Sequence, residues 1–199
     1  MKAKRLYAAA LISVTVAGPS TIASAADRDG NYAIRGPGAE QCSALVELAE
    51  QDDADLSRLS GWVDGYLSAR NRLDDDTFDV SPVVESSPVM ALVLRVCADN
   101  MEATIEAAVD GVVDFLDPAR QQAQSEQREI EHEEARAVIR EETMRQLQGE
   151  LAERGLYDGG VDGVYGPGTR QGIIGFQQEA GLAQTGVPDP ETILRLLLE

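Results

Sequence analysis

The chain has 199 residues, of which 35 are acidic and 17 are basic, and its formal net charge is −18. A surface this acidic argues against nucleic acid as a partner, because binding to phosphates needs clustered cations. It also argues against adhesion to anionic lipid headgroups. A plain solvated surface and a preference for cationic partners both remain open.

The first 25 residues have the three parts of a secretory signal peptide. A basic start (Lys2, Lys4 and Arg5) precedes an apolar run over 6–18 and a small-residue cleavage signature over 23–25. The apolar run is shorter than the roughly 20 residues that a bilayer span needs. We therefore predict a signal peptide over 1–25, secretion of the mature chain, and no membrane span after cleavage. Removing the three cations leaves 14 basic against 35 acidic residues, a net charge of −21.

Residues 31–118 are predicted to form a domain of four helices, because apolar residues recur there at helical spacing. The first helix is expected over 40–50 and a longer one over 56–73. The third is expected to begin with Ser87 as N-cap and Pro88 at the first helical position. The fourth, over 101–116, should end at Asp117-Pro118, since the residue before a proline leaves the helical region.

The two cysteines, Cys42 and Cys97, both lie in this first region. In a secreted chain an even cysteine count predicts a disulfide, here between the first and third helices. A catalytic thiol is the alternative, but the single histidine, His132, lies far from both cysteines in the sequence.

The order of features in residues 31–118 resembles the small periplasmic acid-stress chaperones of the HdeA type. The resemblance rests on the two cysteines, the segment Trp62-Val63-Asp64-Gly65-Tyr66 and the closing amphipathic helix. It implies an all-helical domain that binds other proteins and is not an enzyme. It also implies a switch at low pH, where carboxylates lose their charge. The alternative is a solvated acidic face that does not switch.

Residues 119–142 are charged, with seven Glu and four Arg between Arg120 and Glu142. Glu129, Glu133 and Arg136 have the spacing of neighbours on one helix face. We predict a solvated helical linker, with a partly frayed charged segment as the alternative.

Residues 143–199 are predicted to form three short helices around a glycine-rich loop. Gly155 and Gly181 are placed to end the first two helices, and Thr169 to cap the second. Asp189-Pro190-Glu191 is a typical start for the third. No internal repeat is evident. The whole chain is therefore predicted to be all-α.

The last region resembles the three-helix peptidoglycan-binding domain that is appended to many bacterial wall enzymes and wall-associated proteins. The resemblance runs from about Met144 to Leu198 and rests on these residues in order: Leu147-Gln148, Gly155-Leu156-Tyr157, Val161-Asp162-Gly163-Val164-Tyr165-Gly166, Thr169 and Phe176-Gln177. It implies peptidoglycan as a partner and, together with the predicted signal peptide, a wall-associated protein of the periplasm.

Most of these residues have a structural interpretation, as core residues or turn glycines. Asp162 is expected to bond loop amides, as Asx residues do in turns. The polar and aromatic remainder could contact the ligand by stacking or hydrogen bonding. The candidate binding residues are Tyr157, Asp162, Tyr165, Thr169, Arg170 and Gln177.

The sequence thus predicts a non-enzymatic protein that binds peptidoglycan and presents residues 31–118 to another envelope protein. A wall-tethered chaperone and a small peptidoglycan glycosidase that uses paired carboxylates are the alternatives. One histidine is too few for the usual zinc hydrolases, and Trp62 lies in a helical apolar pattern. We predict no cofactor and no metal.

Overall fold

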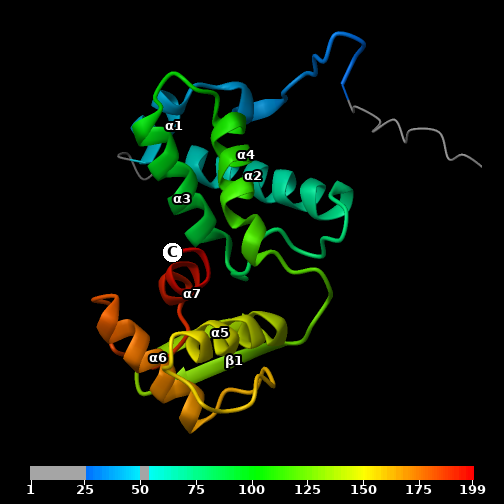
Figure 1. Ribbon diagram of the computed structural model, residues 1–199. Coiled ribbons are helices and arrows are strands. Elements are labelled where there is room, and N and C mark those ends of the chain that lie inside the picture. Colours follow the sequence, from blue (N-terminus) through cyan, green and yellow to red (C-terminus); the bar gives the residue numbers. More distant parts are fainter. Residues whose placement is uncertain (1–25, 50–53) are drawn as a thin grey trace, which may run out of the picture. The chain divides into compact units, whose positions relative to one another are not determined.

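The computed structural model describes residues 26–49 and 54–199 (Figure 1), so the predicted signal peptide lies outside the described residues. The chain divides into a unit that ends at Ala33 and a unit from Ile34 to Glu199. In the first unit, the carboxylate of Asp27 accepts hydrogen bonds from the backbone N–H groups of Asp29 and Asn31. No helix in the described ranges is long and apolar enough to cross a membrane.

The four helices expected in the first region are present (Figure 1). They are α1 (Cys42–Ala49), α2 (Ala54–Leu73), α3 (Ser86–Asp99) and α4 (Ile105–Leu116), with the short 3-10 helices η1 (Gly36–Ala39) and η2 (Asp117–Ala119) at either end.

In the first region, the starts of α3 and α4 differ from the prediction. Helix α3 begins at Ser86, after Glu85, so that Ser87 is not its N-cap. Pro88 is tolerated in the first turn because the N–H that it lacks would have no partner within the helix. Helix α4 begins only at Ile105, where the hydroxyl of Thr104 accepts a hydrogen bond from the N–H of Ala107. Met101 therefore lies outside the helix, 42% exposed.

The predicted disulfide between Cys42 and Cys97 is present and joins α1 to α3. Both cysteines are fully buried, within a core that includes Leu45, Val63 and Val93. Trp62 is half-buried and donates its indole N–H to the carbonyl of Arg35 at 2.7 Å. Its ring lies so close to Gly38 that a Cβ there would come within 2.0 Å of a ring carbon, so only glycine fits.

The helical linker expected over 119–142 is not formed. The chain instead makes an antiparallel hairpin of β1 (Gln127–His132) and β2 (Ala135–Arg140), in which Ile130 pairs with Ala137. Ile130, Ala137 and Ile139 are all buried. The burial of these apolar groups outweighs the few tenths of a kcal/mol that each exposed charge pair adds to a helix.

The three helices of the last region are α5 (Glu141–Glu153), α6 (Pro167–Glu179) and α7 (Pro190–Leu198). Gly155 and Gly181 follow α5 and α6 with φ of +73° and +70°, as predicted for glycines that end a helix. Asp189 caps α7 by accepting a hydrogen bond from the N–H of Thr192. Helix α6 begins at Pro167, so the predicted cap at Thr169 is wrong.

An ion pair and a hydrogen bond join the first four helices to the last region. Arg140 pairs with Asp79 at 2.6 Å, and the two side chains are 11% and 16% exposed. The guanidinium of Arg140 also lies over the ring of Phe78. The hydroxyl of Thr143 donates to the carbonyl of Pro82 at 3.1 Å. The buried residues of both regions form one continuous hydrophobic core.

Replacing Arg140 with Met should lower the free energy of unfolding by about 2 kcal/mol, because the largely buried Asp79 carboxylate loses its cation. Urea denaturation measures the change. Arg136→Met, on the exposed face of the same strand, is the matched control and should shift stability by less than about 0.5 kcal/mol. Equal changes in the free energy of unfolding for the two variants would show that the Arg140–Asp79 pair does not stabilise the fold.

Candidate functional site

A buried glutamine holds the glycine-rich loop between α5 and α6. The side-chain oxygen of Gln148, which is fully buried, accepts a hydrogen bond from the N–H of Gly163 at 2.8 Å. Its NH₂ group lies 3.0–3.2 Å from acceptors on Asp162, Val164 and Thr169. The conformation of the loop is therefore imposed from inside the protein.

The same arrangement occurs a second time, after α6. The side-chain oxygen of Gln177, also fully buried, accepts from the N–H of Gly186 at 2.9 Å. Its NH₂ group lies 3.0–3.1 Å from acceptors on Thr185, Val187 and Thr192.

An internal repeat therefore exists that the sequence analysis did not find. Gly163 and Gly186 both have positive φ, +77° and +70°. The segments 162–169 (DGVYGPGT) and 185–192 (TGVPDPET) can be aligned position by position without a gap. They are identical at four positions, which are Gly163/Gly186, Val164/Val187, Pro167/Pro190 and Thr169/Thr192.

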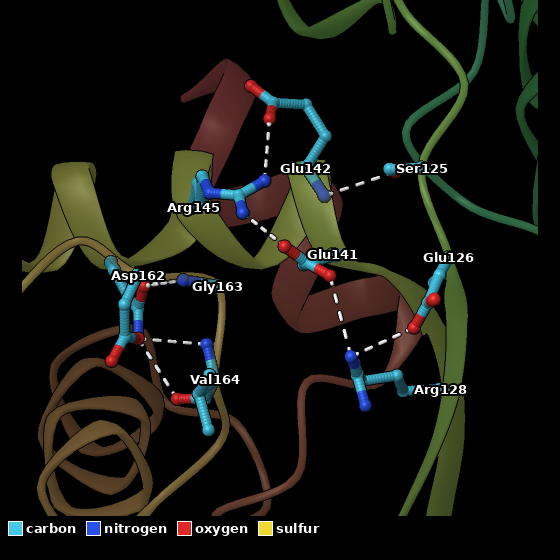
Figure 2. A network of polar contacts seen from close by, with 10 residues as sticks. Ser125, Glu126, Arg128, Glu141, Glu142, Arg145, Asp162, Gly163 and Val164 are labelled. Atoms are coloured by element: carbon cyan, nitrogen blue, oxygen red, sulfur yellow. Dashed lines mark hydrogen bonds and ion pairs between the residues drawn. The ribbon is translucent and has the colours of Figure 1, made fainter.

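The loop rests directly on the first turn of α5. A Cβ at Gly163 would lie 2.9 Å from the carbonyl oxygen of Glu141, so this position also requires glycine. Arg145 pairs with both Glu141 and Glu142, while Arg128 of β1 reaches Glu141 at 3.5 Å (Figure 2). These charge pairs tie the hairpin to the first turn of α5, on which the loop packs.

The polar atoms of Thr169, Gln177 and Asp162 make hydrogen bonds within the protein. Thr169 and Gln177 are 2% and 0% exposed, and their polar atoms bond within the protein. Asp162 is exposed, but its Oδ1 accepts from the N–H of Val164 at 2.9 Å, the predicted turn contact (Figure 2). That N–H, followed by the amide of Gln148, lowers the pKa of Asp162 below its ordinary value. The carboxylate therefore supports the loop at neutral pH, and this support is lost as the pH falls through the lowered pKa.

The two tyrosines are half-buried and lie in different places. Tyr157 donates its hydroxyl to the carbonyl of Gly160 at 2.8 Å and packs against Gly168 at the start of α6. Tyr165 donates its hydroxyl to the carbonyl of Gly186 at 2.7 Å, in the second loop. Burial raises the pKa of Tyr165, and the charge of Arg170 acts in the opposite direction.

Arg170 lies beside a residue that the sequence analysis had not placed near it. Its Nη1 is 2.8 Å from Nε2 of His132, the last residue of β1. Arg170, Tyr165 and His132 thus gather around the second loop, whereas Tyr157 and Asp162 belong to the first. The six predicted residues do not form one cluster.

Two further candidates were missed, Val161 and Val164, which are 51% and 57% exposed on either side of Asp162-Gly163. Their exposure could have been expected from the sequence, because large apolar residues in a glycine-rich loop are poor core candidates. No comparable indication pointed to His132, because its position depends on a hairpin that was not predicted.

Within 26–49 and 54–199, no group of three or more His, Cys, Asp or Glu side chains could hold a metal ion.

Comparison with protein families assigns the last region. Residues 140–196 match the family model PG_binding_1, described as "Putative peptidoglycan binding domain". This segment is a PG_binding_1 domain. No curated protein and no solved structure matched the chain, and no HdeA family matched residues 31–118. The PG_binding_1 domain implies peptidoglycan as a partner, and with the disulfide it indicates a wall-associated location outside the cytoplasm.

Proposed function

We propose that this protein is a periplasmic, non-enzymatic protein that binds peptidoglycan through its PG_binding_1 domain and holds its helical region near the wall. The observation that carries the proposal is the family match over residues 140–196. The glycine loop supports it, because Gln148 fixes the backbone while Val161 and Val164 remain exposed. A loop that is ordered before binding loses little conformational entropy when the ligand arrives.

Co-sedimentation of the mature protein with purified sacculi tests this function. The mature protein should pellet with sacculi and release no muropeptides into the supernatant. Replacing Val161 and Val164 with Ser should weaken binding several-fold, because apolar area at the contact is lost. Leu73→Ser is the matched control, since Leu73 is 73% exposed on α2 and outside the domain.

Failure of the mature protein to pellet would overturn the proposed function. Release of muropeptides would overturn its non-enzymatic part and favour the glycosidase alternative. Equal binding by the double Val variant and by Leu73→Ser would remove the loop from the contact surface.

For the helical region, we propose a basic amphipathic helix of another envelope protein as the partner. A groove of about 470 Å³ lies between α1, α2 and α3, lined mainly by apolar side chains such as Leu56, Met90 and Leu94. The surrounding region, residues 31–118, has 18 acidic residues against five arginines. An apolar groove in an acidic region is complementary to a helix with one apolar face and cationic flanks.

Photo-crosslinking in cells tests this partner. A photo-reactive residue in place of Met90 should give one discrete protein adduct, which weakens as salt is raised. The same residue in place of the exposed Asp75 should give none. An adduct at both positions, or at neither, would count against the groove.

A further inference from the structure

Arg170 differs from every other half-buried arginine in the described part of the chain. Acidic residues outnumber basic ones two to one, and the other half-buried arginines each pair with a carboxylate. Arg170 has no carboxylate partner among the described residues, and its guanidinium bonds only to His132. The paired arginines are Arg70, Arg120, Arg140, Arg145 and Arg195.

The stem of Arg170 is held in place while most of its donors stay available. A Cβ at Gly186 would lie 2.7 Å from Cγ of Arg170, so the stem packs directly on that glycine. A guanidinium has five N–H donors and no acceptor. His132 holds one of these donors through a ring nitrogen, and the described residues offer no hydrogen-bond partner to the others. A fixed planar fork of this kind suits a carboxylate, which it can bind through two parallel hydrogen bonds.

Two further residues, Tyr165 and His132, belong to the surroundings of Arg170. Tyr165 is anchored by its hydroxyl on Gly186, the same residue that supports the stem of Arg170. His132 comes from β1, outside the segment that matches the family model. The glutamates beside it in the chain, Glu131 and Glu133, are exposed and make no ion pair with Arg170. The hairpin therefore orients the arginine without neutralising it.

We propose that Arg170, positioned by His132 and packed on the same glycine that anchors Tyr165, binds a free carboxylate of the peptidoglycan stem peptide. This inference rests on the proposed function and specifies the part of the wall polymer that is recognised. The sugar rings of the glycan strand are neutral, so the carboxylates of an intact strand belong to its peptides. The chain thus extends its PG_binding_1 domain with a hairpin that contributes to ligand recognition.

Binding to sacculi, with Arg170→Gln and Arg136→Gln compared in the mature protein, is the first test. Arg170→Gln should weaken binding about tenfold, which corresponds to about 1.4 kcal/mol. Arg136→Gln removes the same charge from an exposed position on the hairpin and should bind like the unaltered protein. Arg170→Lys should recover only part of the affinity, because an ammonium is a point charge without the planar fork.

Competition with soluble probes identifies the group that is bound. A synthetic stem peptide with free carboxyl groups should displace the unaltered protein from sacculi, and the same peptide with every carboxyl amidated should not. Arg170→Gln should lose this discrimination. Peptide-free glycan strands, which carry a lactyl carboxylate, serve as the third probe and should displace the protein poorly.

His132 is tested as a positioning residue. His132→Phe should weaken binding about threefold and reduce the discrimination between the acid and amide peptides. His132→Gln should restore both, because its amide oxygen can accept from Arg170. Thermal unfolding of both variants should match that of the unaltered protein, which separates loss of positioning from loss of fold.

The outcomes separate this inference from the function on which it rests. If the unaltered protein does not bind sacculi, the proposed function fails. If it binds, but Arg170→Gln binds equally or the acid and amide peptides compete equally, the carboxylate site alone is overturned. Stronger displacement by peptide-free strands than by the stem peptide would overturn the assignment to the peptide.

Discussion

Replacing both Cys42 and Cys97 with Ser should lower the free energy of unfolding by about 4 kcal/mol. The disulfide closes a loop of 55 residues that contains α2 and joins α1 to α3. In the chain-entropy account, the loss arises mostly because the unfolded chain becomes less restricted. The effect is large for a chain of this size, since whole domains are stable by only about 5–15 kcal/mol.

Urea denaturation of the double variant, with and without dithiothreitol, measures this effect. The reductant should destabilise the unaltered protein by the same amount and leave the variant unchanged. Ser43→Ala with Ser87→Ala is a control that alters two other serines near the ends of α1 and α3. A reductant effect well below 1 kcal/mol would mean that the buried core of the helical region is sufficient without the cross-link.

The helices could be predicted from sequence because their signals are local. Apolar residues at intervals of three and four, together with a few caps, placed the seven α-helices of residues 26–49 and 54–199 near their observed positions. The disulfide followed from an even cysteine count in a chain with a predicted signal peptide. The starts of α3 and α6 were misplaced because Pro88 and Thr169 each fit more than one position in a first turn.

The hairpin could not be predicted in this way, because its strength comes from distant contacts. Glutamate and arginine are common in helices, and three of them had helical spacing. The alternation that buries Ala137 and Ile139 spans only a few residues, and its benefit depends on a core built by other segments. Missing the hairpin also meant missing the contact between His132 and Arg170.

Which polar side chains of the candidate site are buried could not be predicted either. A glutamine is normally exposed, and Gln177 was proposed as a ligand contact on that ground, whereas the structure buries it completely. Its bonds to Gly186 and Val187 are visible only once α6 and the second loop are placed together. Whether the exposed candidates touch peptidoglycan stays a prediction.

Gln148→Leu should destabilise the protein by about 3 kcal/mol and weaken its binding to sacculi. The substitution keeps the volume of the buried side chain but removes the partner of the Gly163 N–H and of the Val164 carbonyl. Each buried polar group left without a partner costs about 1–3 kcal/mol. The loop would then lose the arrangement that exposes Val161 and Val164.

The matched control is Gln178→Leu, an exposed glutamine on α6 next to the buried Gln177. It should change the free energy of unfolding by less than about 0.5 kcal/mol. Gln148→Glu separates the two halves of the amide: it keeps an acceptor for Gly163 but loses the donors to Val164 and Thr169. It should therefore be destabilised as well, with the carboxylate adding repulsion against Asp162. If Gln148→Leu instead retained full stability and full wall binding, the loop would owe its conformation to its glycines alone, and Gln148 would be an ordinary core residue.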